Sequence, residues 1–547
     1  MHRHALPVLI LAPFLLAGCN IGSDSSSSQP SNDDSSTSEP PEQGTTFTEV
    51  FASATDSSFT RSFGDGYGGI AWLDYDRDGD LDMLLTNDGN ASNALFSNDG
   101  DGTFTDVTIE ANAVVLDGSS GVAVGDIDND GWPDIFLSGQ GYFIGPVQSD
   151  TVLLHNQGPD INGVVRFVDI AAAAGVPGGD TALSAAFGDI NNDGYVDLFI
   201  TAEGHLDFFS GPGTAVQHSD KLYLNNGDLT FTDISDSYIV NSPVNTGALG
   251  SCAASFSHFD DDEYIDLFVA VCNEVNLLPT PWHVYRNNGD NTFTDVAPMT
   301  QLDKGGFWMS SAFGDIDNDG DFDIFSTNLG LGNRHHLWRN NGDGTYVDIA
   351  SDEMADNFWS WGATFADFDN DGFQDLYYGG EGQAPFARGG TGYLFMNDGN
   401  SRFTRDLASG IPDLDGKGIT GISKADFNGD GFVDLAIMTG TGQPPLLFQN
   451  QGNGNNWISL TLVGISSNAM AIGARIEIVS NSGKFQAREI LAGSSFVSSE
   501  SQWPVFGLGS DKSVDAIVYW PGGEAEEFIG LDAQQRHVLT EGTGSAL

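Results

Sequence analysis

The feature that most restricts the fold of this chain is an acidic loop that occurs seven times. Its full form, Asp-x-Asp-x-Asp-Gly-x-x-Asp, stands between two short apolar runs, and successive copies begin 52 to 69 residues apart. The copies begin at Asp74, Asp126, Asp189, His258, Asp315, Asp367 and Asp426. A fixed repeat of this size leaves room for four short strands in each unit, which is the size of one β-propeller blade.

A second repeated signal completes the unit. After each loop comes an apolar run such as residues 198–201, then a connector, and then a hairpin such as residues 222–234 with Asn-Gly at its turn. Asn-Gly between alternating apolar residues is the strongest local sign of a β-hairpin. Each unit is therefore predicted to run strand A, acidic loop, strand B, connector, strand C, Asn-Gly turn and strand D.

The two ends of the repeat region predict how the ring closes. Residues 46–50, Thr-Phe-Thr-Glu-Val, are a lone copy of strand D, whereas no such copy follows the last strand C at residues 446–450. The N-terminal strand is therefore expected to complete the seventh blade, which leaves no open sheet edge. The predicted fold is all-β: a seven-bladed β-propeller, followed by a small β-sandwich or barrel module.

The acidic loops have the composition of calcium sites. Positions 1, 3, 5 and 9 supply hard oxygen donors, position 7 a backbone carbonyl, and the Gly at position 6 the sharp turn, as in the first half of an EF-hand loop. So many oxygen donors favour Ca²⁺ over Mg²⁺ and transition metals. The alternative is a solvated turn without metal, but six well-formed copies favour about six structural Ca²⁺ ions. The predicted ligands are Asp74, Asp76, Asp78, Asp80, Asp82, Asp126, Asp128, Asp130, Trp132, Asp134, Asp189, Asn191, Asp193, Tyr195, Asp197, Asp315, Asp317, Asp319, Asp321, Asp323, Asp367, Asp369, Asp371, Phe373, Asp375, Asp426, Asn428, Asp430, Phe432 and Asp434.

Loop 4 departs from this pattern. His258 replaces the first Asp and Glu263 replaces the Gly, where a left-handed conformation costs about 1–2 kcal/mol, so Asp260, Asp262 and Asp266 are expected to bind Ca²⁺ weakly or not at all. Cys252 and Cys272 lie ten residues on either side of the loop centre, so they are expected to face each other and form a disulfide worth about 3 kcal/mol. Two unpaired thiols are the alternative. We interpret this disulfide as compensation for the calcium ion that loop 4 is expected to bind weakly or not at all.

The charge and the N-terminus restrict the partners and the location. With 19 Lys and Arg against 77 Asp and Glu, the net charge is −58, which excludes nucleic acid and anionic lipid surfaces as partners. Residues 1–19 are typical of an export signal, because the apolar run 6–16 is too short to span a bilayer. Its end, Leu16-Ala-Gly-Cys19, resembles a bacterial lipobox and implies a lipid on Cys19, which would be the chain's only membrane attachment; a plain signal peptide with an incidental Cys is the alternative. By the same resemblance, Asn20 favours the outer membrane, facing the periplasm or the cell surface, and residues 20–45 form a Ser/Asp/Pro-rich tether.

Two sets of motifs resemble known modules. Phe-Gly-Asp at 187–189 and 313–315 and Phe-Ala-Asp at 365–367 look like the FG-GAP/VCBS repeats of integrin α-chain propellers. Residues 456–462, 472–478, 506–509 and 518–523 resemble the ASPIC/UnbV module that follows such repeats in the cartilage acidic protein family. The resemblance implies a propeller over 46–452 and a C-terminal module over 453–547.

The sequence favours binding over catalysis. No nucleophile elbow, phosphate-binding loop or zinc-spaced cluster stands out. The predicted function is to bind an extracellular glycan or protein; a carbohydrate-active enzyme of the lyase or dehydratase type on the same scaffold is the alternative. The B–C and D–A connectors, on the face opposite the calcium loops, are expected to hold the ligand, unless their side chains only plug the axial channel. The candidates are Tyr142, Phe143, His205, Phe208, Phe209, Trp282, Arg334, His335 and Trp359.

Overall fold

The computed structural model places most of the chain after residue 44. It describes residues 45–547 except 56–67, 88–91, 116–117, 140–150, 178–181, 203–204, 208–213, 217–218, 241–249, 261, 273–279, 303, 330–333, 356–358, 383–390, 413, 415–417 and 440–442. The predicted export signal, Cys19 and almost all of the tether lie outside these residues. In the part that is described, no helix has the length and apolar character needed to cross a membrane.

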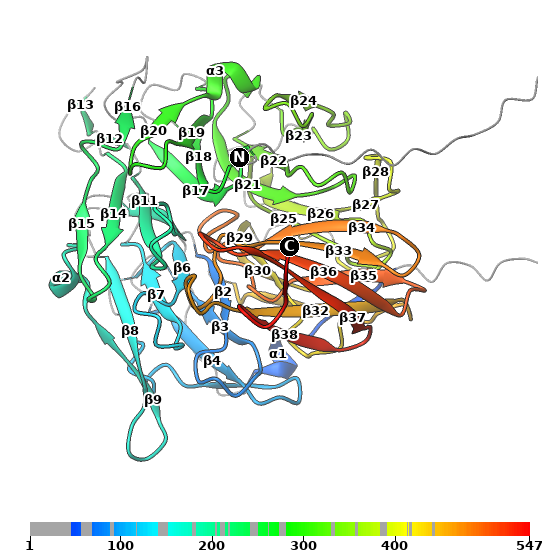
Figure 1. Ribbon diagram of the computed structural model, residues 1–547, viewed down its shortest axis with the longest axis horizontal. Coiled ribbons are helices and arrows are strands. Elements are labelled where there is room, and N and C mark those ends of the chain that lie inside the picture. Colours follow the sequence, from blue (N-terminus) through cyan, green and yellow to red (C-terminus); the bar gives the residue numbers. More distant parts are fainter. Residues whose placement is uncertain are drawn as a thin grey trace, which may run out of the picture. The chain divides into compact units, whose positions relative to one another are not determined.

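Seven antiparallel sheets of four strands each form the blades of the propeller, and blade 4 carries one additional strand (Figure 1). Blade 1 is β2 (Ile70–Leu73), β3 (Asp82–Leu85), β4 (Ala94–Asn98) and β5 (Phe104–Asp106); blade 2 is β6 (Val122–Gly125), β7 (Asp134–Leu137), β8 (Val152–Pro159) and β9 (Val165–Asp169); blade 3 is β10 (Ala182–Gly188), β11 (Asp197–Ala202), β14 (Lys221–Asn225) and β15 (Phe231–Asp233). Blade 4 is β17 (Ser251–Ser257), β18 (Asp266–Val271), β19 (His283–Asn287) and β20 (Phe293–Asp295), with β16 (Ile239–Val240) parallel to β20.

The remaining propeller elements follow the same order. Blade 5 is β21 (Trp308–Gly314), β22 (Asp323–Asn328), β23 (His336–Asn340) and β24 (Tyr346–Asp348); blade 6 is β25 (Trp359–Ala366), β26 (Asp375–Gly382), β27 (Thr391–Asn397) and β28 (Phe403–Arg405). Blade 7 is β29 (Ile419–Ala425), β30 (Asp434–Thr439), β31 (Leu446–Asn450) and β1 (Phe47–Glu49). Short helices α1 (Phe51–Ala54), α2 (Ala171–Ala174) and α3 (Ala297–Thr300) follow the outermost strands β1, β9 and β20, and β12 (His205–Asp207) pairs with β13 (Thr214–Val216) in the connector of blade 3.

The ring closes as the sequence predicts. The innermost strands β2, β6, β10, β17, β21, β25 and β29 contact one another in this order, and β29 contacts β2. Strand β1 completes blade 7, because it pairs antiparallel with β31 in the register Phe47 to Asn450 and Glu49 to Phe448. The first and last propeller strands therefore share one sheet, and the ring has no break between its first and last blades.

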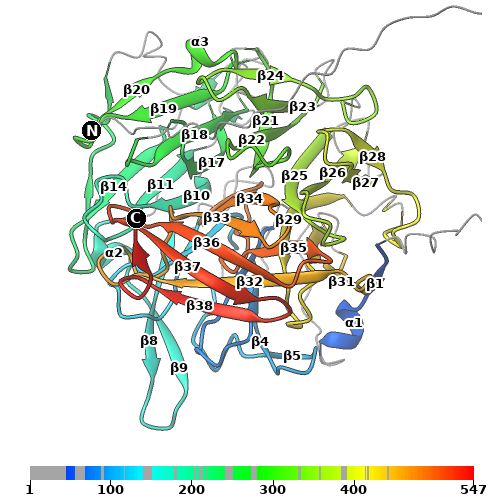
Figure 2. The same ribbon diagram turned by 45° about the vertical axis from the view of Figure 1, so that its right-hand side comes forward.

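The C-terminal module consists of two sheets that share one core. One has the order β35 (Val505–Gly509), β32 (Asn456–Val463) and β38 (Arg536–Thr540); the other has the order β34 (Phe485–Glu489), β33 (Arg475–Ser480), β36 (Ser513–Tyr519), β37 (Ala525–Asp532) and β39 (Ser545–Ala546). Ile458 and Leu460 of the first sheet lie in the same apolar cluster as Ile476 and Val518 of the second. This agrees with the predicted small β-sandwich, drawn in orange and red in Figure 2.

One loop of this module enters the centre of the propeller. Between β34 and β35, residues 490–504 form hydrogen bonds with the innermost strand of every blade. The bonds of blades 1 to 4 are Ser499 N to Ile70 O, Gln502 Nε2 to Val124 O, Phe187 N to Ala492 O and Ser255 Oγ to Gly493 O; those of blades 5 to 7 are Ser495 N to Ser311 O, Ala363 N to Ser495 Oγ and Ser423 Oγ to Ser499 O. The module therefore fills the axial channel, which the sequence analysis did not predict for residues 490–504.

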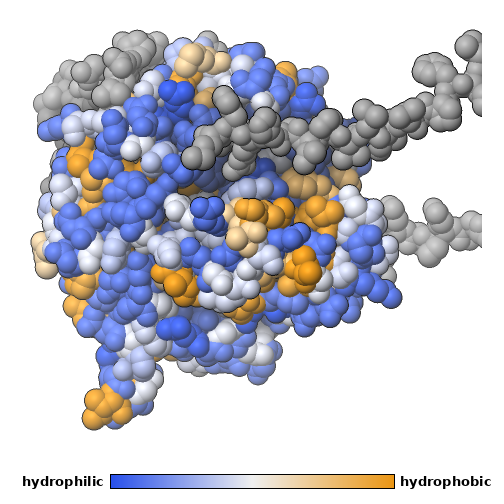
Figure 3. Space-filling model, viewed as in Figure 1, coloured by the Kyte–Doolittle hydropathy of each residue, from blue (hydrophilic) through white to orange (hydrophobic). Residues whose placement is uncertain are grey.

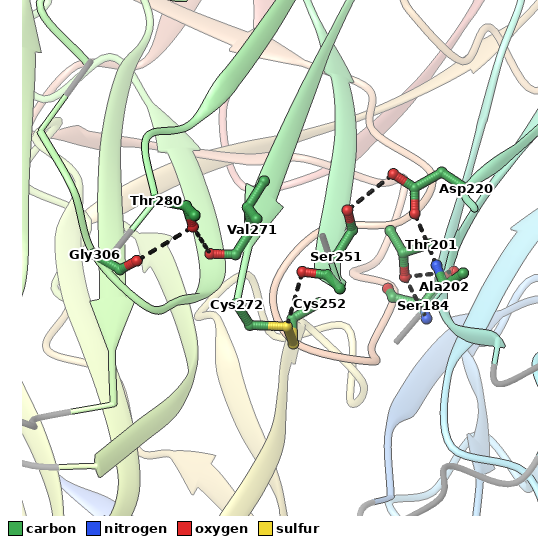
Figure 4. Close-up of a disulfide and its surroundings, with 11 residues drawn as sticks. Ser184, Thr201, Ala202, Asp220, Ser251, Cys252, Val271, Cys272, Thr280 and Gly306 are labelled. Carbon is green, nitrogen blue, oxygen red and sulfur yellow. Dashed lines mark hydrogen bonds between the residues drawn. A yellow bond between two sulfur atoms is a disulfide. The ribbon is translucent and has the colours of Figure 1, made fainter. Parts of the chain in front are cut away.

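The predicted disulfide joins Cys252 in β17 to Cys272, which follows β18, with the two Cα atoms 5.7 Å apart (Figure 4). Both cysteines are buried in one apolar cluster with Phe496 and Val497 of the channel loop. The disulfide therefore joins the start of β17 to the residue after β18, where Phe496 and Val497 pack against it.

Truncation tests the closure of the ring. A protein that begins at residue 51 lacks β1, so β31 becomes an exposed edge, and we expect loss of cooperative unfolding and aggregation. Phe47 is 5 % exposed and its ring packs edge-to-face on Phe368 at 5.6 Å, so its core contacts are also lost. A protein that begins at residue 45 is the control and should unfold like the full chain. Equal calorimetric transitions for both truncations would contradict the closure by β1.

Candidate metal centre

The ninth residue of each loop is a buried aspartate that holds the loop in place. In blade 1, Asp82 Oδ2 accepts a hydrogen bond from Tyr75 N and Asp82 Oδ1 accepts one from Asn98 N, each at 2.8 Å. The same two bonds recur in the other six blades, at Asp134, Asp197, Asp266, Asp323, Asp375 and Asp434, with distances of 2.7–3.1 Å. One carboxylate thus joins the loop of a blade to its third strand.

The asparagine at the end of that third strand joins neighbouring blades. Asn98 Nδ2 donates to Phe427 O of blade 7 at 2.7 Å, and the equivalent bond to the preceding loop occurs in blades 2, 3, 4, 6 and 7. In blade 5, Asn340 Nδ2 instead donates to Phe322 O of its own blade at 3.4 Å. The junction between blades 4 and 5 is therefore built differently from the other six.

The first aspartate and two left-handed residues shape the loop. Asp126 accepts hydrogen bonds from Asp130 N at 3.2 Å and Gly131 N at 2.7 Å, and the first aspartates of loops 3, 5, 6 and 7 do the same. The Gly at position 6 has φ between 85° and 102° in the six regular loops, which favours glycine. Position 4 also has positive φ, and four loops place Asn there, which tolerates it.

Four loops gather three carboxylates whose oxygens lie within 4.8 Å of one another. They are Asp74, Asp76 and Asp78 in loop 1; Asp126, Asp128 and Asp134 in loop 2; Asp315, Asp317 and Asp323 in loop 5; and Asp367, Asp369 and Asp371 in loop 6. Buried oxygens without a hydrogen-bond partner occur at Asp74 Oδ1, Asp76 Oδ1, Asp128 Oδ1 and Asp317 Oδ1. A buried carboxylate oxygen without a partner is costly, and a cation among the three acids removes that cost. The residues present therefore fit an oxygen-ligated divalent ion.

Burial and mutual repulsion oppose ionisation in these loops. Burial raises the pKa of Asp126 to about 7, with the nearby Asp134 adding to the shift. Burial likewise raises the pKa of Asp74 to about 6, where Asp78 and Asp76 add repulsion, and the pKa of Asp315 to about 7. A bound cation favours the ionised carboxylates that burial disfavours, so it stabilises the folded loops.

Among the described residues, loops 3, 4 and 7 form no such group of three acids. Loops 3 and 7 have Asn191 and Asn428 at position 3, and each amide donates to the aspartate two residues later, at 3.0 and 2.9 Å. In loop 4, Glu263 is absent from the described non-glycine residues with positive φ, so the strain expected there does not occur. Four loops thus carry the groups of three acids. The expected count of about six Ca²⁺ ions stays a prediction.

His155, next to loop 2, was missed in the sequence. Its Nε2 lies 3.4 Å from Asp128 Oδ2 and its Nδ1 lies 3.2 Å from Asp134 Oδ1. The hydrogen bond to Asp134 raises the pKa of His155 above its ordinary value. The signal that would have found it is its place immediately before Asn156, the asparagine that joins blades 1 and 2.

The C-terminal module rests on the same rim as the loops. Arg536 Nη2 donates to Gly79 O at 2.7 Å, and Ala469 N donates to Asn129 Oδ1 at 2.8 Å. In loop 4, Glu489 accepts hydrogen bonds from Ser257 Oγ at 2.6 Å and His258 N at 3.0 Å. The side chain of His258 also contacts the module, because its Nε2 lies 3.2 Å from Gly473 O. That the disulfide compensates for a missing metal in this blade stays a prediction.

The structure corrects part of the predicted ligand face. Trp282 is fully buried and packs on Trp308 at 6.2 Å. His335 is also fully buried; its Nδ1 accepts from Asn328 N at 3.0 Å, and burial lowers its pKa to about 3. Neither side chain reaches a ligand, because both belong to the packing between strands.

Of the other candidates, two are described at the level of side chains. Arg334 keeps 42 % of its side chain exposed and donates from Nη2 to Ala350 O at 2.8 Å, and Trp359 is half-buried at the start of β25. His205 begins β12, but its side chain lies outside the description, as do Tyr142, Phe143, Phe208 and Phe209.

Comparison with known families agrees with this architecture. Residues 74–137, 258–326 and 323–378 match the FG-GAP-like repeat, and residues 464–546 match the family described as ASPIC and UnbV. The chain carries FG-GAP-like repeats and an ASPIC/UnbV domain. It is similar to cartilage acidic protein 1, which has this architecture: it is 25 % identical over 479 residues to the protein from Mus musculus, covering 83 % of this chain and 70 % of the relative, and 26 % identical over 489 residues to the protein from Xenopus tropicalis, covering 83 % and 70 %.

Solved structures share the arrangement only distantly. A lectin from Agrocybe aegerita, described for its recognition of non-reducing terminal N-acetylglucosamine, is 16 % identical, covers 72 % of this chain and 92 % of its own, and has a TM-score of 0.39. A lectin from Burkholderia pseudomallei is 11 % identical, covers 72 % and 97 %, and has a TM-score of 0.44. Likenesses at this level support no statement about the ligand of the FG-GAP chain.

Calcium removal tests the metal assignment. Chelation with EGTA should lower the melting temperature and calcium should restore it, because Ca²⁺ at about 100 times its dissociation constant stabilises by about 2.7 kcal/mol per site. Asp128→Asn in loop 2 should reduce this calcium-dependent gain, as measured by calorimetry. Asp262→Asn in loop 4, which forms no group of three acids with its described neighbours, is the matched control. A melting temperature indifferent to EGTA would contradict the metal sites.

Proposed function

We propose that this protein is an exported, calcium-stabilised binding protein, anchored by a lipid on Cys19 in the outer membrane, whose propeller presents an extracellular ligand site. The observation that carries the proposal is the recurrence of three-carboxylate groups in four loops of one ring. Oxygen-only donors of this kind suit Ca²⁺. Calcium is plentiful outside the cell, and the disulfide between Cys252 and Cys272 suits an oxidising compartment.

The calcium loops are proposed to be structural, and the ligand site to lie elsewhere. Asp74, Asp126 and Asp315 donate oxygens to a cation in loops that also join strands and blades, and the C-terminal module lies over part of that rim. The cation then keeps the loops folded and fixes the blades in their places. The face in Figure 3 is mostly hydrophilic with scattered apolar patches, which suits a protein that works in water and meets its ligand at a confined site.

The lipid anchor is tested by fractionation. The full chain, expressed in a bacterium with an outer membrane, should sediment with that membrane, and Cys19→Ala should move it to the soluble fraction because the attached acyl chains are lost. The folded domain should keep its melting temperature in both forms. A Cys19→Ala protein that stays with the membrane would contradict the anchor.

The binding role is tested with residues 45–547 loaded with calcium. The protein should bind a defined ligand on an array of glycans or of secreted proteins, and EGTA treatment should abolish that binding because the blades lose their order. A matched sample of EGTA-treated protein to which calcium is returned controls for irreversible damage. A calcium-loaded protein that binds nothing on either array would contradict the proposal.

A further inference from the structure

The residue at position 7 of the acidic loops is aromatic in five blades and an aspartate in two, which changes the surface beside the turn between the third and fourth strands. In blades 2, 3, 4, 6 and 7 it is aromatic, and its ring lies against the glycine of the turn that joins the third and fourth strands. A Cβ added to that glycine would lie 2.5–3.1 Å from the ring; the pairs are Trp132 with Gly158, Tyr195 with Gly227, Tyr264 with Gly289, Phe373 with Gly399 and Phe432 with Gly452. In blades 1 and 5 the residue is Asp80 or Asp321, and a carboxylate oxygen lies 2.7 Å from the added Cβ in place of the ring. A carboxyl group is smaller and more polar than an aromatic ring, so the surface beside this turn changes in these two blades.

In blade 5 a groove of about 370 Å³ lies beside Asp321, at the junction with blade 4. Phe259 and Asp260 of loop 4 line one side, and the turn residues Gly342 and Asp343 of blade 5 line the other. At this junction Asn340 Nδ2 donates within its own blade, so the described residues lack the asparagine bond to the preceding loop that the other six blades have. The groove thus lies where two features depart from most of the repeat: the acidic Asp321 at position 7 and the bond of Asn340.

The groove combines acidic groups with apolar surface. The carboxyl groups of Asp260, Asp321 and Asp343 line it, together with Phe259 and the 65 % exposed side chain of Met299. The cation among its lining residues is Arg475, which pairs with Glu477 Oε1 at 2.7 Å and lies over the ring of Phe322 at 5.7 Å. Arg475 is therefore paired with Glu477, and three aspartates line the groove together with this one arginine.

We infer that this groove binds a lysine or arginine side chain of an extracellular protein partner. Met299 and Phe259 would contact the aliphatic part of the side chain, and Asp321 and Asp343 would attract its charged end, which is the chemistry that long cationic side chains need. The net charge of −58 would draw a basic partner toward the protein. The inference rests on the proposed binding role and names its site and the class of its partner.

The groove beside the equivalent turn of blade 1 is a poorer candidate. Its lining includes the apolar residues Val50, Ala54 and Phe427, but Asp101 is the one acidic residue among its lining. One carboxyl group attracts a cationic side chain less strongly than the three that line the blade 5 groove. The proposed partner is thus assigned to the groove between blades 4 and 5.

The test measures binding of a fluorescent, acetylated and amidated octalysine peptide to calcium-loaded residues 45–547 by fluorescence anisotropy, at about 150 mM salt to screen remote charges. Asp343→Asn should weaken binding by about three- to fivefold. Asp228→Asn is the matched control, because Asp228 occupies the same turn position in blade 3, where Tyr195 fills the space. Both aspartates accept two bonds from a threonine, Thr345 and Thr230, so the turns lose the same contacts.

A third variant fills the groove. Asp321→Tyr introduces the residue that loop 3 carries as Tyr195, so it should abolish binding. The calcium-dependent melting temperature should be kept, because position 7 is expected to offer the metal its backbone carbonyl, which the substitution does not remove. The same peptide made with N-acetyllysine, which has no charge, should not bind the wild-type protein. Selective loss in Asp343→Asn and Asp321→Tyr supports the groove.

The other outcomes overturn the inference in different ways. Equal weakening by Asp343→Asn and Asp228→Asn would mean that the peptide binds the acidic surface in general. A wild-type protein that ignores octalysine but binds a ligand on the arrays would reject the basic partner and leave the proposed binding function intact. If a neutral glycan binds the wild-type protein on the array and does not bind Asp321→Tyr, the groove binds a sugar and not a basic side chain.

Discussion

The structure depends on one interaction repeated seven times: a buried aspartate at the ninth loop position whose two oxygens accept backbone hydrogen bonds. Asp82 joins its own loop to strand β4, and Asn98 at the end of β4 then reaches the carbonyl of Phe427 in the preceding blade. The two backbone donors offset part of the cost of burying the carboxyl group, and burial still raises the pKa of Asp82 well above its ordinary value. Acidic loop, blade and ring are thus connected through the same few atoms, so a cation bound in a loop would affect the packing between blades.

The C-terminal module adds a second connection, through the centre. Residues 490–504 bond to all seven innermost strands, and Phe496 and Val497 pack beside the disulfide. A propeller with strands splayed around an open channel would leave backbone groups unpaired there, and the loop supplies their partners. Residues 490–504 of the module therefore belong to the folded core of the propeller.

Blade 4 shows how a repeat changes when one of its copies takes another role. His258 stands where a metal ligand is expected, and its side-chain Nε2 lies 3.2 Å from Gly473 O of the module. At the next junction the bond of Asn340 to the preceding loop is replaced by one within its own blade, and a groove lies beside Asp321. These departures lie together on the rim, where Asp343 and Met299 are exposed. Departures from a regular pattern concentrate where a protein binds something, because regular packing leaves no space for a ligand.

The sequence by itself determined the seven units, the pairing of Phe47–Glu49 with β31, the acidic loops and the Cys252–Cys272 bond. All of these follow from spacing along the chain, since strands, turns and the disulfide loop join residues at short or repeated separations. Only the tertiary structure decided that Trp282 and His335 are buried, that His155 lies beside loop 2 and that residues 490–504 fill the channel. Some of these contacts join residues hundreds of positions apart, and a local sequence pattern does not show which distant residues meet. Others depend on which side of a strand faces a neighbour, and the side chains of Trp282 and His335 have the same chemistry on a surface as in a core.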